Sequence, residues 1–266
     1  MMAATQLDFD DTADDASQLK AAPLWAFESR IGKPPSQGAA AIVHKCRGAD
    51  QKIFNGETGS NCAIATRDAE DQLLPCENIE SHVEEFLRFS KANPTTPFTV
   101  LPGPQKKTPA EQERFTDLLR NAPQNVVLPG RMLESLDRLH TVRIVILDAN
   151  FSVDERERKR VLDQYFSANR GLWDADAIEI VSFGSYQSIV SNDKFANELG
   201  FRHRIMHADE HIYGDYALQA RDILSIGYAT KLVCLNDPTG TSTGNQVGSL
   251  HLAAGADLQI DESLIE

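Results

Sequence analysis

Four short apolar runs in the second half of the chain predict strands. They are Val142-Arg-Ile-Val-Ile-Leu147, Ala177–Val181, Phe201–His207 and Lys231–Leu235. The segments between and after them predict helices, because apolar residues recur there at helical spacing or turn residues bound them. These helices are expected at 154–169, 192–199, 215–224 and 246–254. Strands that alternate with helices favour an open parallel sheet of the doubly wound type.

The first half of the chain alternates in the same way. Strands are expected at Cys62–Thr66, Phe98–Leu101 and Asn125–Leu128, with an amphipathic helix before Asn93-Pro94. Thr108 and Pro109 predict the start of another helix, as its cap and its first residue. The turn Pro129-Gly130 and a charged helix at 131–139 place a candidate boundary near residue 140. We therefore expect two α/β domains, at 23–140 and 141–266, after a flexible acidic arm at 1–22.

Composition narrows the classes of partner. The chain has 266 residues, 41% of them hydrophobic, and a net charge of −13, which disfavours broad contact with nucleic-acid backbone or anionic membrane. No apolar run reaches the length of a membrane span, so a soluble, intracellular protein is expected. The four cysteines form no C-x-x-C pair and predict buried, reduced thiols. A protein partner or a small ligand fits this composition better than nucleic acid or membrane.

The carboxyl ends of the predicted second-half strands carry the candidate ligand site. Asp148, Ser182 and the loop from Asn236 should face one crevice, since ligands of such sheets bind at that edge. The loop residues Gly240, Thr241, Ser242, Thr243 and Gly244 precede a predicted helix, whose free N–H groups would suit a phosphate. The alternative is a plain β-to-α turn that needs small residues only for its geometry. Arg221 is the candidate for a bidentate contact to phosphate or carboxylate, and its alternative is a surface helix arginine.

The residues indicate no metal site, no cofactor and no identifiable catalytic group. His203, His207 and His211 recur every four residues, but the alternation from Phe201 to His207 is that of a strand rather than of a zinc-binding helix. Candidate nucleophiles and bases exist, and none stands in a recognisable nucleophile motif. The candidates are Ser182, Ser185, Cys62, His44, His207 and His251.

Residues 141–255 resemble the SLOG superfamily, a Rossmann-like nucleotide-binding group that includes the cytokinin-activating LOG hydrolases. The matching pieces are Val142-Arg-Ile-Val-Ile, Ile180-Val-Ser182, Gly214-Asp-Tyr-Ala217 with Arg221-Asp222, and Pro238-Thr-Gly-Thr-Ser-Thr-Gly244. Two loops depart from the family pattern. Asp148-Ala149-Asn150 stands where members have Gly-Ser-Arg, and Phe183-Gly-Ser-Tyr-Gln187 stands where they have a glycine-rich loop.

Residues 23–130 resemble a macrodomain-like domain of phage non-structural proteins. The matching pieces are Gly38-Ala-Ala-Ala41, Gly59–Asp68, and the segment through Leu101. Relatives continue that last strand into a glycine-rich loop, whereas this chain has Pro102-Gly-Pro-Gln-Lys-Lys107.

Together the resemblances imply a phage protein built on nucleotide-binding scaffolds whose glycine loops are eroded. The first hypothesis is a non-enzymatic adaptor or selectivity protein that binds phage or host proteins. Its expected location is the cytoplasm of an infected bacterium or a phage-made compartment within it. The alternatives are a binder or sequestering sponge of an ADP-ribose-type nucleotide, and a nucleotide N-glycosidic hydrolase that would need Asp148 or Asp215.

Overall fold

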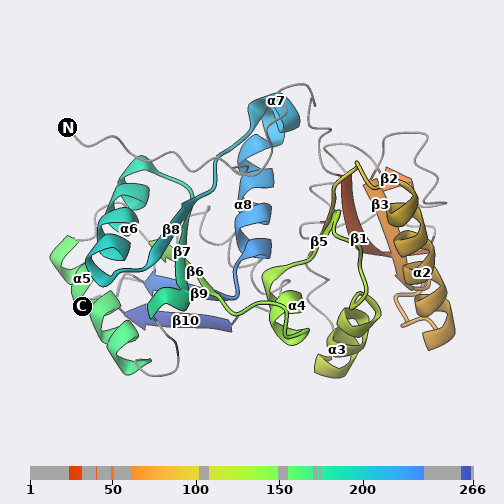
Figure 1. Cartoon of the computed structure of the whole chain (residues 1–266), viewed down its shortest axis with the longest axis horizontal. Helices are drawn as coiled ribbons and strands as arrows, with labels where there is room; N and C mark the ends of the chain where they lie inside the picture. Colours follow the sequence, from red (N-terminus) through yellow and green to blue (C-terminus); the bar gives the residue numbers. More distant parts are fainter. Residues whose placement is uncertain are drawn as a thin grey trace.

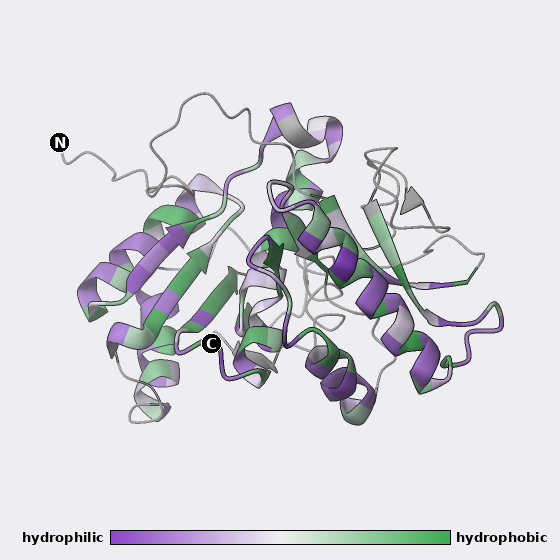
Figure 2. Ribbon diagram, turned by 45° about the vertical axis from the view of Figure 1, so that its right-hand side comes forward, coloured by the Kyte–Doolittle hydropathy of each residue, from purple (hydrophilic) through white to green (hydrophobic). Residues whose placement is uncertain are grey.

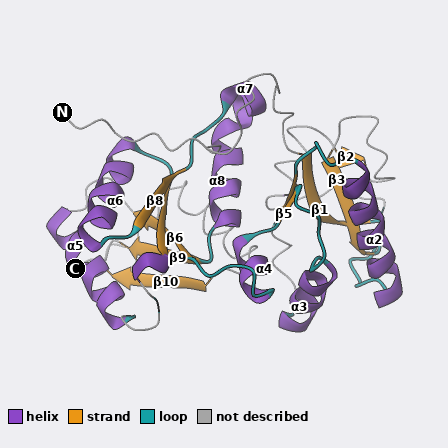
Figure 3. Ribbon diagram, viewed as in Figure 1, coloured by secondary structure: helices purple, strands orange, loops and turns teal. Residues whose placement is uncertain are grey.

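The fold contains two parallel β-sheets that lie side by side (Figures 1 and 3). A computed structural model describes residues 24–31, 40, 49–50, 61–101, 108–148, 155–169, 173, 175–236 and 259–264. Within these ranges each sheet has five strands. The α/β class expected from the alternating pattern is confirmed.

The first sheet has the strand order β2-β3-β1-β4-β5. Its strands are β1 (Leu24–Arg30), β2 (Ala49–Asp50), β3 (Asn61–Arg67), β4 (Phe98–Val100) and β5 (Val126–Val127). The central strand is β1, which pairs in parallel with β3 and β4. This strand contains the apolar run Leu24–Phe27 and was not among the predicted strands.

The second sheet has the strand order β10-β9-β6-β7-β8. Its strands are β6 (Val142–Asp148), β7 (Ile178–Ser182), β8 (Arg202–Ile205), β9 (Lys231–Asn236) and β10 (Gln259–Leu264). Numbered along the chain this order is 5-4-1-2-3, the order of a Rossmann-like sheet, with its switch point between β6 and β9. The four predicted strands are all present, and the fifth, β10, was not predicted.

Helices cover the outer faces of both sheets, and one helix stands between them (Figure 1). The first half contributes α2 (Cys76–Ala92), α3 (Pro109–Leu118) and α4 (Gly130–Ser135). The second half contributes α5 (Glu155–Ala168), α6 (Tyr186–Leu199), α7 (Glu210–Tyr213) and α8 (Ala217–Tyr228). No helix in the described ranges is long and apolar enough to cross a bilayer.

The central helix α8 packs against both sheets. Ala220 and Ile223 join a buried cluster with Trp25 and Phe27 of the first sheet. Further along the helix, Ile226 packs with residues of the second sheet. Figure 2 shows several strands of both sheets as mainly hydrophobic and the outer helices as largely hydrophilic. The predicted boundary near residue 140 falls between β5 and β6, and the division into two domains stays a prediction because α8 ties the halves together.

Local sequence signals set several helix ends. The side chain of Thr108 accepts a hydrogen bond from the Glu111 N–H, and the Thr108 N–H donates to Glu111, so the predicted cap is a complete capping box. Ser185 caps α6 by accepting from the Ser188 N–H, which starts this helix six residues before the predicted residue 192. The helix expected at 131–139 is shorter and ends at Ser135.

Candidate functional site

The predicted crevice lies at the carboxyl edge of the second sheet. There β6 ends at Asp148, β7 at Ser182 and β9 at Asn236, and β6 is the neighbour of both other strands. The loop residues Gly240, Thr241, Ser242, Thr243 and Gly244, together with the predicted helix after them, lie outside the described residues. The backbone of Asp148 thus has the predicted position beside the switch point, and the structure describes no part of the predicted phosphate loop.

Ser182 belongs to a buried hydrogen-bond network on the α6 side of the sheet. Its Oγ lies 2.9 Å from the Nε2 of His203, whose Nδ1 lies 3.0 Å from the Oδ1 of Asp193. Asn192 of α6 donates its Nδ2–H to the same Oγ at 2.8 Å and accepts a hydrogen bond from Arg158 of α5. The network joins two strands to the two helices that cover them.

The order serine, histidine, carboxylate is the order of a nucleophilic triad, but here the serine is sealed. Ser182 is only 1% exposed, and α6 covers it through Asn192. Burial lowers the pKa of His203, and the hydrogen bond and charge of Asp193 oppose that shift. A neutral His203 that donates from Nδ1 to Asp193 can accept the Ser182 proton at Nε2, so each group in the chain is satisfied. This arrangement holds α6 to the sheet and offers no attacking group to a substrate.

The surroundings of Cys62 and Ser185 exclude these two candidate nucleophiles, whereas two of the candidate bases are not described. Cys62 is buried in the first sheet, and burial raises its pKa to about 12, so its thiolate is suppressed. Ser185 is committed to capping α6. His44 and His251 lie outside the described residues.

Arg221 stands on the second turn of α8, beside the carboxyl end of β7. Its guanidinium carbon lies 5.6 Å from the ring centre of Phe183, the residue after Ser182. Its Nε and Nη2 both donate to the Oδ1 of Asp222, at 2.9 and 2.6 Å. Burial raises the pKa of Asp222, and Arg221 opposes the shift. The structure therefore brings Arg221 to the predicted edge, with its charge already balanced by its neighbour.

The three spaced histidines do not share a helix. His203 is in β8, His207 follows that strand outside any helix, and His211 is in the short helix α7. The strand periodicity expected for His203 is confirmed by β8, although the strand is shorter than predicted. Among the described residues no group of three metal-binding side chains forms.

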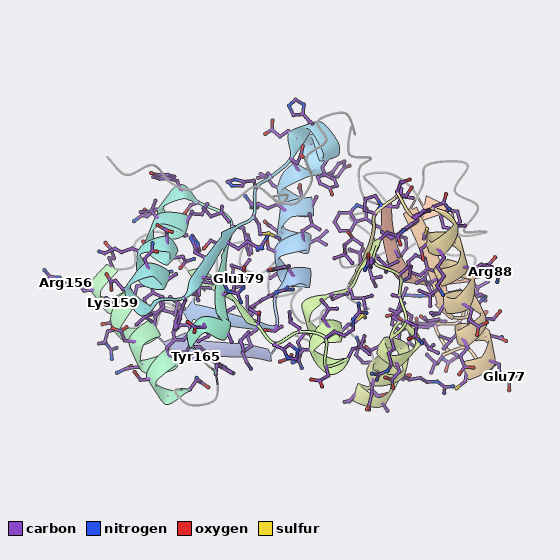
Figure 4. All side chains as sticks on the ribbon, in the orientation of Figure 1. Glu77, Arg88, Arg156, Lys159, Tyr165 and Glu179 are labelled. Carbon is purple, nitrogen blue, oxygen red and sulfur yellow. The ribbon has the colours of Figure 1, made fainter. Side chains whose placement is uncertain are left out.

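A second polar cluster, which was not predicted from the sequence, lies on the opposite face of the same sheet. Glu179 of β7 is buried and lies between the strands and α8 (Figure 4). It accepts a hydrogen bond from the Tyr228 hydroxyl at 2.7 Å and meets Arg204 at 3.1 Å and Arg143 at 3.7 Å. The guanidinium carbon of Arg143 lies 3.8 Å from the centre of the Tyr228 ring. The alternation of charged and apolar residues in β8 was visible in the sequence, but its partners were not.

Large apolar side chains are exposed where α6 and α8 begin, at the carboxyl edge. Tyr186, the first residue of α6, is 83% exposed, and Leu218, near the start of α8, is 58% exposed. Val190, one turn beyond Tyr186, and Tyr216, just before α8, are also exposed. These helices lie on opposite faces of the sheet, so the four side chains flank its edge from both sides.

A cavity of about 250 Å³ opens at the opposite, amino edge of the second sheet. Phe166, Trp173, Ile178, Leu199 and Phe201 supply its apolar walls. It does not coincide with the predicted crevice, because Ile178 begins β7 whereas Ser182 ends it.

Comparisons with known proteins place the chain in no family. No family model and no curated protein match it. Among solved structures it is similar to dihydropteroate synthase from Xanthomonas albilineans, with 14% identity, 92% of this chain and 88% of that chain covered, and a TM-score of 0.26. It is also similar to formimidoylglutamase from Bacillus subtilis, with 9% identity, 89% and 74% coverage, and a TM-score of 0.22. Similarities this weak carry no argument about function.

Proposed function

We propose that this is a non-enzymatic protein that binds other proteins at the carboxyl edge of its second sheet. The observation that carries the proposal is the distribution of side chains at that edge, which is the opposite of the distribution in an active site. Among the described residues of that edge, Ser182 is buried and Arg221 is paired with Asp222, whereas large apolar side chains are exposed. Exposed aromatic and aliphatic side chains serve as anchors in protein interfaces.

The polar groups at this edge favour a binding role over catalysis because other side chains of the fold already occupy them. Ser182 is enclosed by Asn192 and His203, and Arg221 is neutralised by Asp222. A hydrolase would have to break these contacts before it could use either residue. Each contact stabilises the fold as it stands, so the network is better explained as support for the edge than as a reaction centre.

The resemblance to phage proteins supplies the expected setting. In that setting the protein acts as an adaptor or selectivity factor in the cytoplasm of an infected bacterium, and its partners are phage or host proteins. The macrodomain-like and SLOG-like assignments of the two halves belong to the same proposal, and the Rossmann-like strand order of the second sheet supports the latter.

The test places a photo-crosslinking amino acid at position 186 or 218 in cells where the partners are present. A matched probe at Leu73, an apolar residue 40% exposed in the first half, controls for general stickiness. We expect discrete crosslinked species from positions 186 and 218, lost on Leu218→Ser or Tyr186→Ser, and none from position 73. Equal labelling from all three positions would contradict the proposal. So would turnover of a nucleotide derivative that Arg221→Ala abolishes.

A second candidate is the binding of a phosphorylated nucleotide, for which ADP-ribose is the model ligand. The strand order favours it, because the switch point between β6 and β9 is where Rossmann-like sheets hold ligands. Isothermal titration with ADP-ribose, NAD and cyclic nucleotides tests it. Heat that is lost in a Gly240→Val variant, and kept in Leu218→Ser, would favour the ligand over the protein partner.

A further inference from the structure

Strand β8 forms one edge of the second sheet. Among the described strands its neighbour is β7, and its other side faces no strand. An edge of this kind presents backbone N–H and C=O groups that a partner strand can use. Addition of an extended peptide to a free edge is a common mode of protein recognition.

The face of β8 that looks toward α8 is basic. Arg143, Glu179 and Arg202 stand in one row across three parallel strands, since Arg143 pairs with Glu179 and Glu179 with Arg202. Arg204 lies two residues further along β8, on the same face as Arg202. The row and its neighbour thus place three arginines on the face that carries Glu179, and two of them, Arg143 and Arg204, contact its carboxylate.

The positive charges act on one another. Burial lowers the pKa of Arg143. Tyr228 and Glu179 oppose this shift, and the charges of Arg204 and Arg202 add to it. Arg202 is exposed, and its Nη2 donates to the Thr141 hydroxyl at 2.9 Å. Within the described ranges no carboxylate lies within ion-pair distance of Arg202. A carboxylate added at this edge would pair with the positive charge of Arg202 and reduce the repulsion among the arginines.

We propose that β8 binds an extended acidic segment of a partner protein, which adds as a strand and places carboxylates against Arg202 and Arg204. The proposal rests on the protein-binding function above and names a second surface with its partner chemistry. Charge complementarity selects this partner, because a chain of net charge −13 has few basic surfaces.

The alternation along β8 sets the pattern that the partner should carry. Arg202 and Arg204 point to one face, whereas His203 and Ile205 point to the other. His203 is already committed to Ser182 and Asp193. The segment should therefore carry acids at every second position on the α8 side, with small or β-branched residues between them.

The competing explanation is that the arginines only protect the edge from pairing, as charged side chains do on many sheet edges. It predicts that neither acidic peptides nor other strands bind. A second copy of the chain is another possible occupant, and it predicts a dimer without any peptide. The experiment separates these three outcomes.

The experiment measures fluorescence anisotropy of a labelled peptide of about eight residues that alternates Asp with Val or Thr. The full chain is titrated at low and high salt, and Arg202→Glu is compared with Arg88→Glu, a matched reversal on the outer face of α2 (Figure 4). We expect salt-sensitive binding that Arg202→Glu weakens about tenfold or more and Arg88→Glu leaves within about twofold. Hydrogen exchange should show slower exchange in β8 when the peptide is bound.

Four results would overturn the proposal. The first is no binding at low salt, and the second is equal weakening by both reversals. The third is unchanged binding of a peptide with proline at every second position, which cannot add as a strand. The fourth is a peptide-free dimer that Arg202→Glu dissociates. A Leu218→Ser variant that still binds the peptide but loses its crosslinked partner would separate this surface from the carboxyl-edge function.

Discussion

The Nε2 of His203 lies 2.9 Å from the Oγ of Ser182, so two residues 21 positions apart in sequence form one buried contact at the carboxyl end of β7. Asn192 and Asp193, adjacent residues of α6, contact Ser182 and His203 respectively. This contact ties β7, β8 and α6 together beside the predicted crevice. Because of this contact we interpret Ser182, a candidate nucleophile, as a structural residue.

Ser182→Ala should therefore cost stability rather than activity. The change leaves the Asn192 amide and His203 Nε2 without their partner in a dry site, which costs about 1–3 kcal/mol. Urea unfolding measures the loss, with Ser167→Ala, an exposed serine at the end of α5, as the control. A fluorophosphonate probe should not label the native protein. Labelling of the native protein that is absent in Ser182→Ala would show that Ser182 is a reactive nucleophile.

Stability should fall as the pH drops below about 6.5, in part because of His203. Its pKa is lowered in the folded state, mainly by burial, so the unfolded chain binds the proton more readily. The contribution of neutral His203 to the free energy of unfolding is fully present above pH 6.5, the unfolded pKa. It is lost progressively as the pH falls from 6.5 to the folded pKa. Asp222 acts in the opposite direction and at lower pH: burial raises its pKa in the folded state, so acidification through the range just above its unfolded value of 3.8 adds stability.

The measurement is urea unfolding at a series of pH values from neutral to mildly acidic. The unfolding free energy of His203→Gln should depend less steeply on pH than that of the wild type, because glutamine keeps a polar group without titrating. His211→Gln, an exposed histidine of α7, is the matched control. An unchanged slope in His203→Gln would assign the acid sensitivity elsewhere.

Glu179→Gln should be among the most destabilising single changes. The amide cannot balance Arg143 and Arg204, and it leaves a partly buried pair of positive charges. Loss of one member of such a group costs about 3–5 kcal/mol when burial is complete, and less here because the Arg204 side chain is 35% exposed. Thermal unfolding compares it with Glu134→Gln, which sits in an exposed ion pair with Arg131.

The same cluster predicts that Tyr228 resists ionisation. Burial, then the hydrogen bond to Glu179, raises its pKa to about 12. In ultraviolet difference spectra of the native protein, one tyrosine should stay un-ionised until the pH approaches about 12. In Tyr228→Phe the spectra should lose this late step and keep the earlier ones. If the late step persists, another phenol is responsible.

Gly130→Ala should separate α4 from α8. A Cβ at residue 130 would lie 2.4 Å from the carbonyl oxygen of Tyr228 and 2.6 Å from that of Ala229. Both obstacles are backbone, so the helices must shift, at a cost of about 1–3 kcal/mol or more. Unfolding of Ser135→Ala, an exposed position on the same helix, should stay near wild type. A neutral Gly130→Ala would mean that the helices approach less closely than described.

The packing of α8 predicts that the halves unfold together. Ile223 is buried with Trp25 and Phe27 of the first sheet, so Ile223→Ala should cost about 2–5 kcal/mol. The chain has two tryptophans, one in each half, and Trp173→Phe leaves Trp25 to report on the first sheet. We expect its fluorescence transition to coincide with the loss of circular dichroism. Two separate transitions would favour independent domains.

Features that depend on near neighbours could be predicted from the sequence. Apolar runs such as Val142–Leu147 and turn residues between them fixed the α/β class and four strands of the second sheet. Thr108, Pro109 and Glu111 determined the start of α3, because a capping box is complete within four residues. Ser182 was correctly placed at the carboxyl edge because parallel strands end together.

Features that depend on distant partners became visible only in the folded chain. The tertiary structure made Leu24–Arg30 the central strand of the first sheet, and it placed α8 against both sheets. It also decided that Ser182 is enclosed and that Glu179 gathers Arg143, Arg204 and Tyr228. Periodicity shows which face of an element is buried, but not which element covers it. That choice fixes whether a polar side chain is free to bind a partner or is used to hold the fold together.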